Sequence, residues 1–243
     1  MIYKPIIIVL GEPYSVFSEI FFKFLKSSKI KFLKNPIIVI GCEKLLNKQM
    51  KKLKYKFKFN QVESANIKYT NLDNKKINIV DIKFNFDKTF DKISSRSNSY
   101  ILKCFKNALF ILKNYGGYLI NGPVSKKYFL LKKYLGVTEF LSSSLKEKDP
   151  VMLIYNPNFS VSPITTHLPI NKISRAISKK KIIDKILKIN EFYKKYLKKI
   201  PRIALLGLNP HCETIDKIGE EEKYIIPALN YLKKKKIRIK GIF

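Results

Sequence analysis

The sequence predicts an α/β fold built on a parallel sheet with helices on both faces. Ile6–Leu10 and Pro36–Ile40 are continuous apolar runs, as expected of strands covered on both sides. Each run stops at a glycine, Gly11 or Gly41, and a stretch of helical periodicity follows. Two consecutive strand–loop–helix units favour a parallel sheet, because the crossover helix returns the chain to the same edge. The 243 residues are enough for one large unit or for two lobes.

The first helix is expected directly after Gly11-Glu12-Pro13, with Ser15 or Ser18 as its cap. Its expected apolar positions are Val16, Phe17, Ile20, Phe21 and Leu25. The second helix is expected over Glu43–Leu53. Residues 54–91, rich in Lys, Asn and Asp, are interpreted as an irregular insertion with short strand-like pieces at Tyr55–Phe59 and Ile77–Phe86.

A long amphipathic stretch, Ser97–Tyr115, predicts a helix that ends at Gly116-Gly117. Tyr118–Ile120 then begins another buried strand. The segment Asn121–Lys126 is expected as a loop at the head of a helix, where backbone N–H groups and a lysine can meet an anion. Thr138 is expected to cap a short helix.

The remaining elements are predicted as alternating strands and helices. Asn156-Pro157-Asn158 is a strong turn signal between two expected strands. The expected elements are the strands Val151–Tyr155 and Ser160–Ile164, a helix over Lys179–Lys199, a strand at Arg202–Leu206, a helix from Gly219 to Leu232, and a strand that begins at Ile237–Ile239.

The charge is extreme, with 49 Lys and Arg against 18 Asp and Glu, a formal net charge of +31. Such a balance suggests nucleic-acid binding. However, only four of the basic residues are arginines, the residue that base readout and bidentate phosphate contacts favour. Lysine enrichment together with many Ile, Asn, Phe and Tyr is typical of AT-rich coding. We therefore expect a solvated lysine surface and no specific nucleic-acid partner.

Cysteine usage and hydropathy place the chain among cytoplasmic proteins. Cys42, Cys104 and Cys212 form no C-x-x-C pair, and an odd number does not suggest a disulfide framework. The first residues lack the apolar core of a signal peptide. No apolar run approaches the ~20 residues of a membrane span, so no membrane association is expected.

The chain has two histidines, and each follows an apolar run that reads as a strand. His167 ends Val161–Thr166, and His211 ends Leu205-Leu206-Gly207-Leu208-Asn209-Pro210. Because the expected crossover helix lies between them, the two imidazoles can converge at one sheet edge and bind a metal. A lone loop histidine is more often structural, and two ligands do not complete a catalytic site. Glu213 and Asp216 lie nearby, but neither is clearly a third ligand.

Rival chemistries have weaker support. Cys212 adjoins His211 in sequence, which does not align a thiol with the ring. Nucleophile-elbow, G-x-G-x-x-G and P-loop motifs are absent from the sequence.

Four motifs together resemble the 4-hydroxythreonine-4-phosphate dehydrogenase family of pyridoxal 5′-phosphate biosynthesis, in that family's order and spacing. They are Asn121–Lys126, Gly136–Leu141, Ile164–Pro169 and Gly207–His211. Gly11-Glu12-Pro13 with Glu19-Ile20 looks like a degraded form of the family's opening motif. Gly219 and Glu221-Glu222 match the segment that follows the Asn-Pro-His motif.

The resemblance implies a two-lobed α/β/α fold like that of isocitrate and isopropylmalate dehydrogenases, which bind NAD without G-x-G-x-x-G. Residues 1–120 would form the first lobe, and residues 121–243 the second, with the metal and substrate motifs. His167 and His211 fall on metal-binding positions, and Thr138 on a substrate-binding threonine that contacts the phosphate. A homodimer with the active site at the subunit interface is also implied. No catalytic residue is assigned.

The implied reaction is the NAD-dependent oxidation and decarboxylation of 4-phosphohydroxy-L-threonine to 3-amino-2-oxopropyl phosphate. A divalent cation (zinc, magnesium or cobalt) would act as a Lewis acid on the substrate hydroxyl and stabilise the enolate, and NAD would accept the hydride.

Three departures from the family pattern qualify this expectation. Val137 stands where the family usually has a histidine, and Cys212-Glu213-Thr214 replaces Ala-Gly-Glu. The family continues beyond residue 243 with a Tyr-His-Asp-Gln motif that carries its third metal histidine. We therefore expect a chain truncated at its C-terminus, with that histidine encoded beyond it. The alternatives are an inactive truncated remnant of the enzyme and, less favoured, a basic nucleic-acid-binding protein.

Overall fold

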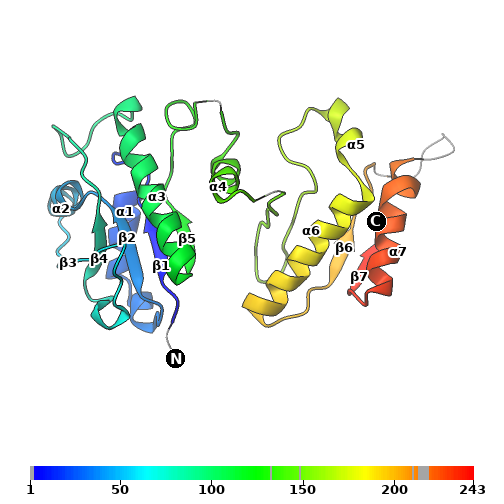
Figure 1. Ribbon diagram of the computed structural model, residues 1–243, viewed down its shortest axis with the longest axis horizontal. Coiled ribbons are helices and arrows are strands. Elements are labelled where there is room, and N and C mark those ends of the chain that lie inside the picture. The colour runs from blue at the N-terminus through cyan, green and yellow to red at the C-terminus, as the bar shows by residue number, and fades with distance from the viewer. Residues whose placement is uncertain (1–2, 132, 148, 210, 213–218) are drawn as a thin grey trace. The chain divides into compact units, whose positions relative to one another are not determined.

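The computed structural model divides the chain into two compact units, residues 1–147 and 148–243 (Figure 1). The structure describes residues 3–131, 133–147, 149–209, 211–212 and 219–243. The division lies after residue 147, not at the expected boundary of 120. Residues 121–147 belong to the first unit because Leu130 and Phe140 are buried in its hydrophobic core.

The first unit contains a five-stranded sheet in the order β3-β4-β2-β1-β5, with every neighbouring pair parallel. Its strands are β1 (Ile6–Val9), β2 (Ile37–Gly41), β3 (Phe59–Gln61), β4 (Ile77–Asp81) and β5 (Tyr118–Asn121). β1 lies between β2 and β5, with Ile6 opposite Ile37 on one side and Tyr118 on the other. The predicted parallel sheet is confirmed.

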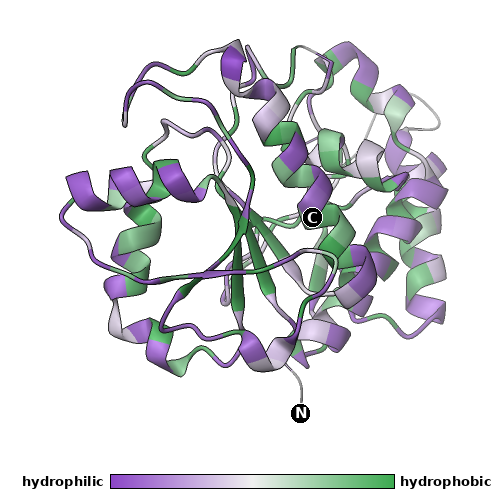
Figure 2. Ribbon diagram, turned by 60° about the vertical axis from the view of Figure 1, so that its left-hand side comes forward, coloured by the Kyte–Doolittle hydropathy of each residue, from purple (hydrophilic) through white to green (hydrophobic). Residues whose placement is uncertain are grey.

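Helices cover both faces of this sheet, and Figure 2 shows its strands as a hydrophobic band among helices of mixed polarity. Ile7 and Val9 of β1 pack in one cluster with α3, whereas Ile8 packs in a second cluster with α1 and α2. This alternation is the period of two that a pleated strand imposes. The helices are α1 (Phe17–Lys26), α2 (Glu43–Lys52), α3 (Asn98–Tyr115) and α4 (Val137–Leu145).

The interpretation of residues 54–91 as an insertion was wrong. This segment supplies β3 and β4, and β4 lies between β2 and β3 in the sheet. A buried asparagine obscured the apolar pattern of β4: Asn78 is buried, and its amide donates to the Ile37 carbonyl at 2.9 Å. Its neighbours Ile77 and Ile79 belong to the core.

Two further expectations for the first unit need correction. β5 is an edge strand, and its side chains Tyr118 and Ile120 are 46% and 47% exposed, so it is not a buried strand. At the start of α1, Val16 and Ile20 are exposed, whereas Phe21 is buried as predicted and the unpredicted Phe22 also fills the core. Ser15 does contribute at the start of this helix, since its Oγ accepts from the Phe17 N–H at 3.3 Å.

The second unit packs helices against a two-stranded parallel sheet, β6 (Ile203–Leu205) with β7 (Ile239–Gly241). Its helices are α5 (Ile173–Ala176), α6 (Lys179–Phe192) and α7 (Ile226–Lys234). π-Helical turns, Tyr193–Leu197 and Glu221–Ile225, adjoin α6 and α7. Residues from α6, α7 and both strands share one core, so the helices and strands expected from Lys179 onward are confirmed.

The expected strands Val151–Tyr155 and Ser160–Ile164 reduce to a single antiparallel bridge between Ile154 and Val161. The turn between them is confirmed, because the Asn158 N–H donates to Asn156 Oδ1 at 2.9 Å. Pro163 has no N–H to extend a ladder, which explains why the pairing ends early. Among the helices that the structure describes, none has the length and apolar character needed to cross a membrane.

Candidate functional site

A buried carboxylate organises the edge of the first sheet where β1 and β5 end. Glu12 is only 3% exposed. Its Oε2 accepts from Ser97 Oγ at 2.8 Å, and its Oε1 accepts from the Ser125 N–H at 3.0 Å. Its own N–H donates to the Pro123 carbonyl at 2.9 Å. One side chain thus joins the β1 loop, the start of α3 and the loop that follows β5.

This close approach requires glycine on both loops. Gly11 has φ of +74°, and a Cβ there would collide with the Pro123 carbonyl. A Cβ on Gly122 would collide with the Leu10 carbonyl and lie 2.9 Å from Phe17 Cδ1.

The same contacts correct the expected anion site at Asn121–Lys126. The described residues from 122 to 136 form turns and bends, and no helix begins after this loop. Its available N–H at Ser125 is already bonded to the Glu12 carboxylate. That N–H is therefore not free for an anion.

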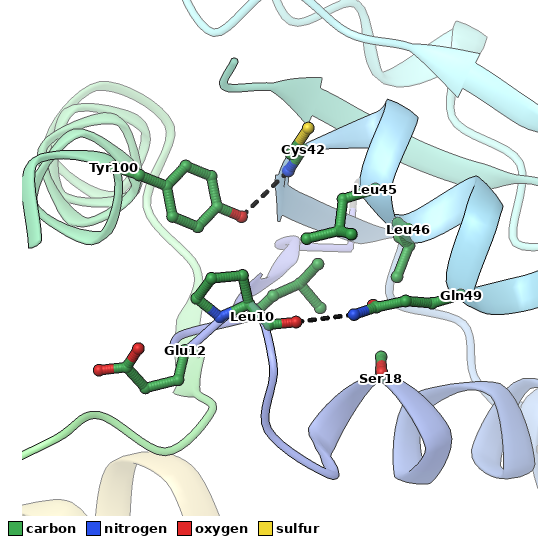
Figure 3. Close-up of a pocket in the computed structure, with 9 residues that line it drawn as sticks. Leu10, Glu12, Ser18, Cys42, Leu45, Leu46, Gln49 and Tyr100 are labelled. Atoms are coloured by element: carbon green, nitrogen blue, oxygen red, sulfur yellow. Dashed lines mark hydrogen bonds between the residues drawn. The ribbon is translucent and has the colours of Figure 1, made fainter. Parts of the chain in front are cut away.

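A small cavity lies beside Glu12, between α1, α2 and α3 (Figure 3). Its volume of about 10 Å³ leaves room for one water at most. The Tyr100 hydroxyl accepts from the Cys42 N–H at 3.0 Å, and the Gln49 amide donates to the Pro13 carbonyl at 2.7 Å. Among the described residues, Ser18 Oγ finds no hydrogen-bond partner. The cavity is part of the core and too small for a substrate.

Burial suppresses the ionisation of Tyr100, which lines this cavity, and of Cys104, which lies on the same helix. Desolvation raises the pKa of Tyr100 well above its ordinary value, and raises the pKa of the Cys104 thiol to about 12. A protonated, enclosed thiol is not a nucleophile.

A larger, open hollow of about 540 Å³ lies elsewhere in the first unit, at the carboxyl ends of β3 and β4. It is lined by Gln61, Glu63, Asp81 and their neighbours.

The expected substrate residues Val137 and Thr138 form the first turn of α4. Gly136, not Thr138, is the residue that caps this helix. The Thr138 side chain is exposed and accessible to a ligand, whereas Val137 is half-buried and packs against the core. Phe140 holds the helix in place, with its ring 5.2 Å from that of Phe105 in an edge-on contact.

An acidic side chain lies at the same end of α4. Glu139 folds back so that Oε2 would be 3.0 Å from a Cβ placed on Gly136. A carboxylate is stabilised at a helix N-terminus, but it also repels a phosphate that approaches the same N–H groups.

His167 lies in a loop of the second unit and does not follow a strand, contrary to expectation. Its side chain is exposed, and its backbone is left-handed with φ of +57°. Such a conformation is uncommon for a residue other than glycine and concentrates at functional sites. Lys185 lies beneath the preceding residues, with Nζ 3.5 Å from the Pro163 carbonyl. Burial lowers the pKa of Lys185, and the nearby charge of Lys181 lowers it further.

His211 follows β6, as predicted, and its side chain is exposed. Asn209 Oδ1 accepts from the His211 N–H at 3.0 Å, and the Asn209 carbonyl accepts from the Cys212 N–H at 3.2 Å. The Cys212 sulfur folds back against Gly207, where a Cβ would lie 2.5 Å from it. Glycine at 207 therefore allows the turn to close.

A buried glutamate supports this turn. Glu221 is 1% exposed, and its Oε1 accepts from the Leu208 N–H at 2.8 Å. The Asn209 Nδ2 lies 3.5 Å from the same oxygen. Neither Glu12 nor Glu221 was predicted as a site residue, although Gly11-Glu12-Pro13 and Glu221-Glu222 both belong to the segments that carry the family resemblance.

Both histidines belong to the second unit, whereas Val137 and Thr138 belong to the first. The described residues contain no group of three His, Cys, Asp or Glu side chains arranged to hold a metal ion. The possible third ligands Glu213 and Asp216, like Thr214, lie outside the described residues. The donor set is thus two exposed imidazoles, which suits a transition metal but does not complete a site.

Comparison with known proteins identifies the family. Residues 33–243 match the profile of "Pyridoxal phosphate biosynthetic protein PdxA". A 4-hydroxythreonine-4-phosphate dehydrogenase of Sulfurihydrogenibium sp. is 31% identical over 236 residues, which cover 96% of this chain and 71% of that protein. A Clostridium botulinum protein named "Putative D-threonate 4-phosphate dehydrogenase" is 26% identical, over 98% of this chain and 72% of its own length.

The fold agrees with this relationship. The crystal structure of a 4-hydroxythreonine-4-phosphate dehydrogenase from Burkholderia phymatum superposes with a TM-score of 0.80 at 23% identity, over 98% of this chain and 73% of that one. PdxA proteins generally use NAD and a divalent metal. On the profile match and the 31% identity, this chain belongs to the PdxA family.

Proposed function

We propose that this protein acts as an NAD-dependent dehydrogenase on 4-phosphohydroxy-L-threonine. The observation that carries the proposal is the 31% identity to a 4-hydroxythreonine-4-phosphate dehydrogenase over 96% of the chain. Oxidation of the C3 hydroxyl gives a β-keto acid, which loses carbon dioxide. The proton released in the oxidation is taken up at C2 in the decarboxylation, and the product is 3-amino-2-oxopropyl phosphate.

His167 and His211 are the residues that we assign to the divalent cation. Both are exposed imidazoles of the same unit, and the backbone of His167 is left-handed. The remaining ligand comes from outside the described residues. When bound, the cation supplies Lewis-acid polarisation of a substrate oxygen. We assign no residue to NAD, which supplies the hydride acceptor.

Thr138 is assigned to the substrate phosphate. Its hydroxyl is exposed in the first turn of α4, where N–H groups without helical partners favour an anion. Val137 offers the phosphate no hydrogen-bond donor and instead packs against the core. A homodimer with the active site between its subunits is part of the same proposal, and its support is the membership of the PdxA family.

A second substrate has specific support, because a protein named for D-threonate 4-phosphate aligns over 98% of this chain. The two substrates share the C3 hydroxyl and the phosphate, and they differ in the C2 substituent, an ammonium group in one and a hydroxyl in the other. A carboxylate near C2 would favour the ammonium. Discrimination therefore depends on residues around C2 and not on Thr138.

The test is NADH formation by the full chain with each substrate and with zinc, magnesium or cobalt. Turnover should require the metal, and a chelator should abolish it. We expect His167→Asn and His211→Asn to lower turnover more than about a hundred-fold, since the outer-shell partners of metal ligands alone contribute about 10–100-fold. Lys172→Ala, an exposed change in the same region as His167, is the control.

Absence of NADH formation with either substrate, together with no zinc binding, would support the inactive remnant instead. Steeply salt-dependent binding to nucleic acid without turnover would favour the third alternative. Sedimentation of the chain at several concentrations tests the dimer.

A further inference from the structure

Glu221 has an unusual environment for an acidic residue. It lies at the start of the helical segment that leads into α7, yet its side chain is 1% exposed and points to a different segment, the turn after β6. Burying a carboxylate is costly unless its oxygens find donors. One oxygen does, and among the described residues Oε2 has no hydrogen-bond partner. We therefore ask which part of the structure the hydrogen bonds of this buried carboxylate hold in place.

The bonds of Oε1 lead to His211 in two steps. The Leu208 N–H donates to Oε1 at 2.8 Å, which fixes the backbone three residues after the end of β6. The amide nitrogen of Asn209 also faces Oε1, at 3.5 Å. That contact directs the other end of the amide, Oδ1, to the His211 N–H at 3.0 Å.

We propose that Glu221 is a positioning residue for His211. Its buried carboxylate fixes the turn at Leu208 and orients the Asn209 amide, which in turn holds the backbone of His211. The role of His211 as a metal ligand rests on the proposed function, but the positioning itself does not. Because Oε1 alone makes these bonds, glutamine should replace Glu221, whereas alanine and aspartate should not. Aspartate keeps the charge but is shorter by one methylene.

The two histidines make a direct readout possible. Imidazole signals in an NMR spectrum of the full chain come from His167 and His211 alone, and His167→Asn assigns them. In metal-free protein, Glu221→Ala and Glu221→Asp should shift or broaden the His211 signals and leave those of His167 unchanged. Glu221→Gln should retain the wild-type spectrum. A merely structural contribution to stability would not separate the two histidines in this way.

Glu222 provides the matched control. It is the adjacent acid and is exposed, and among the described residues its hydrogen bond is to the Gly219 N–H, which donates to Oε2 at 2.7 Å. Glu222→Ala should therefore reduce thermal stability and leave both imidazole signals in place. The proposal is overturned if Glu221→Asp leaves the His211 signals at their wild-type positions, or if Glu222→Ala shifts them equally.

A zinc titration tests whether the positioning of His211 affects metal binding. If His211 is a ligand, zinc should perturb its signals in the wild-type chain, and Glu221→Asp should weaken that binding about 10–100-fold, the range typical of outer-shell partners. If zinc perturbs neither histidine in the wild-type chain, the metal assignment fails. The metal-free spectra of the Glu221 variants still decide the positioning role.

Discussion

Replacement of Glu12 tests whether one carboxylate joins the loops at the end of β1 and β5. In Glu12→Ala, the Ser125 N–H loses its acceptor, while the Ser97 hydroxyl can turn its single hydrogen to the Ser94 carbonyl, 2.9 Å away. Hydrogen bonds to a charged group contribute about 1.5–3 kcal/mol each. Because Ser97 recovers part of its loss, we expect the first unit to be destabilised by about 3 kcal/mol.

Glu12→Gln is the matched variant. Its amide oxygen still accepts from Ser125, and its NH₂ group donates to Ser97 Oγ, whose hydrogen is then free for Ser94. The expected loss is below about 1 kcal/mol. The assay is urea unfolding, monitored by hydrogen exchange in peptides that cover β1 and β5. These peptides report on the unfolding of the first unit alone. With a slope of about 2 kcal/mol per M, alanine should lower the midpoint by roughly 1.5 M. Equal losses for alanine and glutamine would refute the hydrogen-bond argument.

Three other perturbations test the structure further. Asn209→Asp should raise the apparent zinc dissociation constant about ten-fold or more, because a second carboxylate would then face Glu221. An unchanged constant would contradict the proposal that Glu221 holds His211 through Asn209. Glu139→Gln should strengthen phosphate binding in a titration with inorganic phosphate, since it removes a negative charge from the start of α4; weaker binding counts against a phosphate there. Stability should fall as pH rises from 9 to 12, because the unfolded Cys104 thiol, with an ordinary pKa of 9.0, loses its proton before the folded thiol does, at about 12. The slope is about 1.4 kcal/mol per pH unit, and Cys104→Ala should reduce it in urea titrations.

Apolar periodicity was enough to predict the core of the first unit. β1, β2, α2 and α3 follow from runs whose hydrophobic positions match the periods of a covered strand or an amphipathic helix. The predicted strand-like piece Ile77–Phe86 contains β4, but its place inside the sheet was not predicted. Asn78 interrupts the apolar run, and the bond that satisfies Asn78 reaches a residue 41 positions away. A single sequence does not reveal such a partner.

The residues that hold the candidate site in place were harder to predict, because their partners are also distant in the sequence. His167 and His211 were identified because histidine is rare in this chain. The Glu12 carboxylate meets Ser97 and Ser125 across 85 and 113 positions, and these contacts exist only after the sheet has formed. The strand predicted before His167 does not form. Its prediction was based on hydrophobicity alone and did not consider that Pro163 has no N–H to donate.

The position of β1 between β2 and the edge strand β5 has a consequence for the order of folding. Its pairing with β2 closes a separation of 31 residues (37 − 6), whereas its pairing with β5 closes one of 112 (118 − 6). The longer closure costs about 1 kcal/mol more in chain entropy. During synthesis, β1 and β2 can pair while the other edge of β1 waits for β5 to leave the ribosome. Until then, that edge of Ile6–Val9 is an open template for strand addition, and a nascent chain stalled before residue 118 should be prone to aggregate.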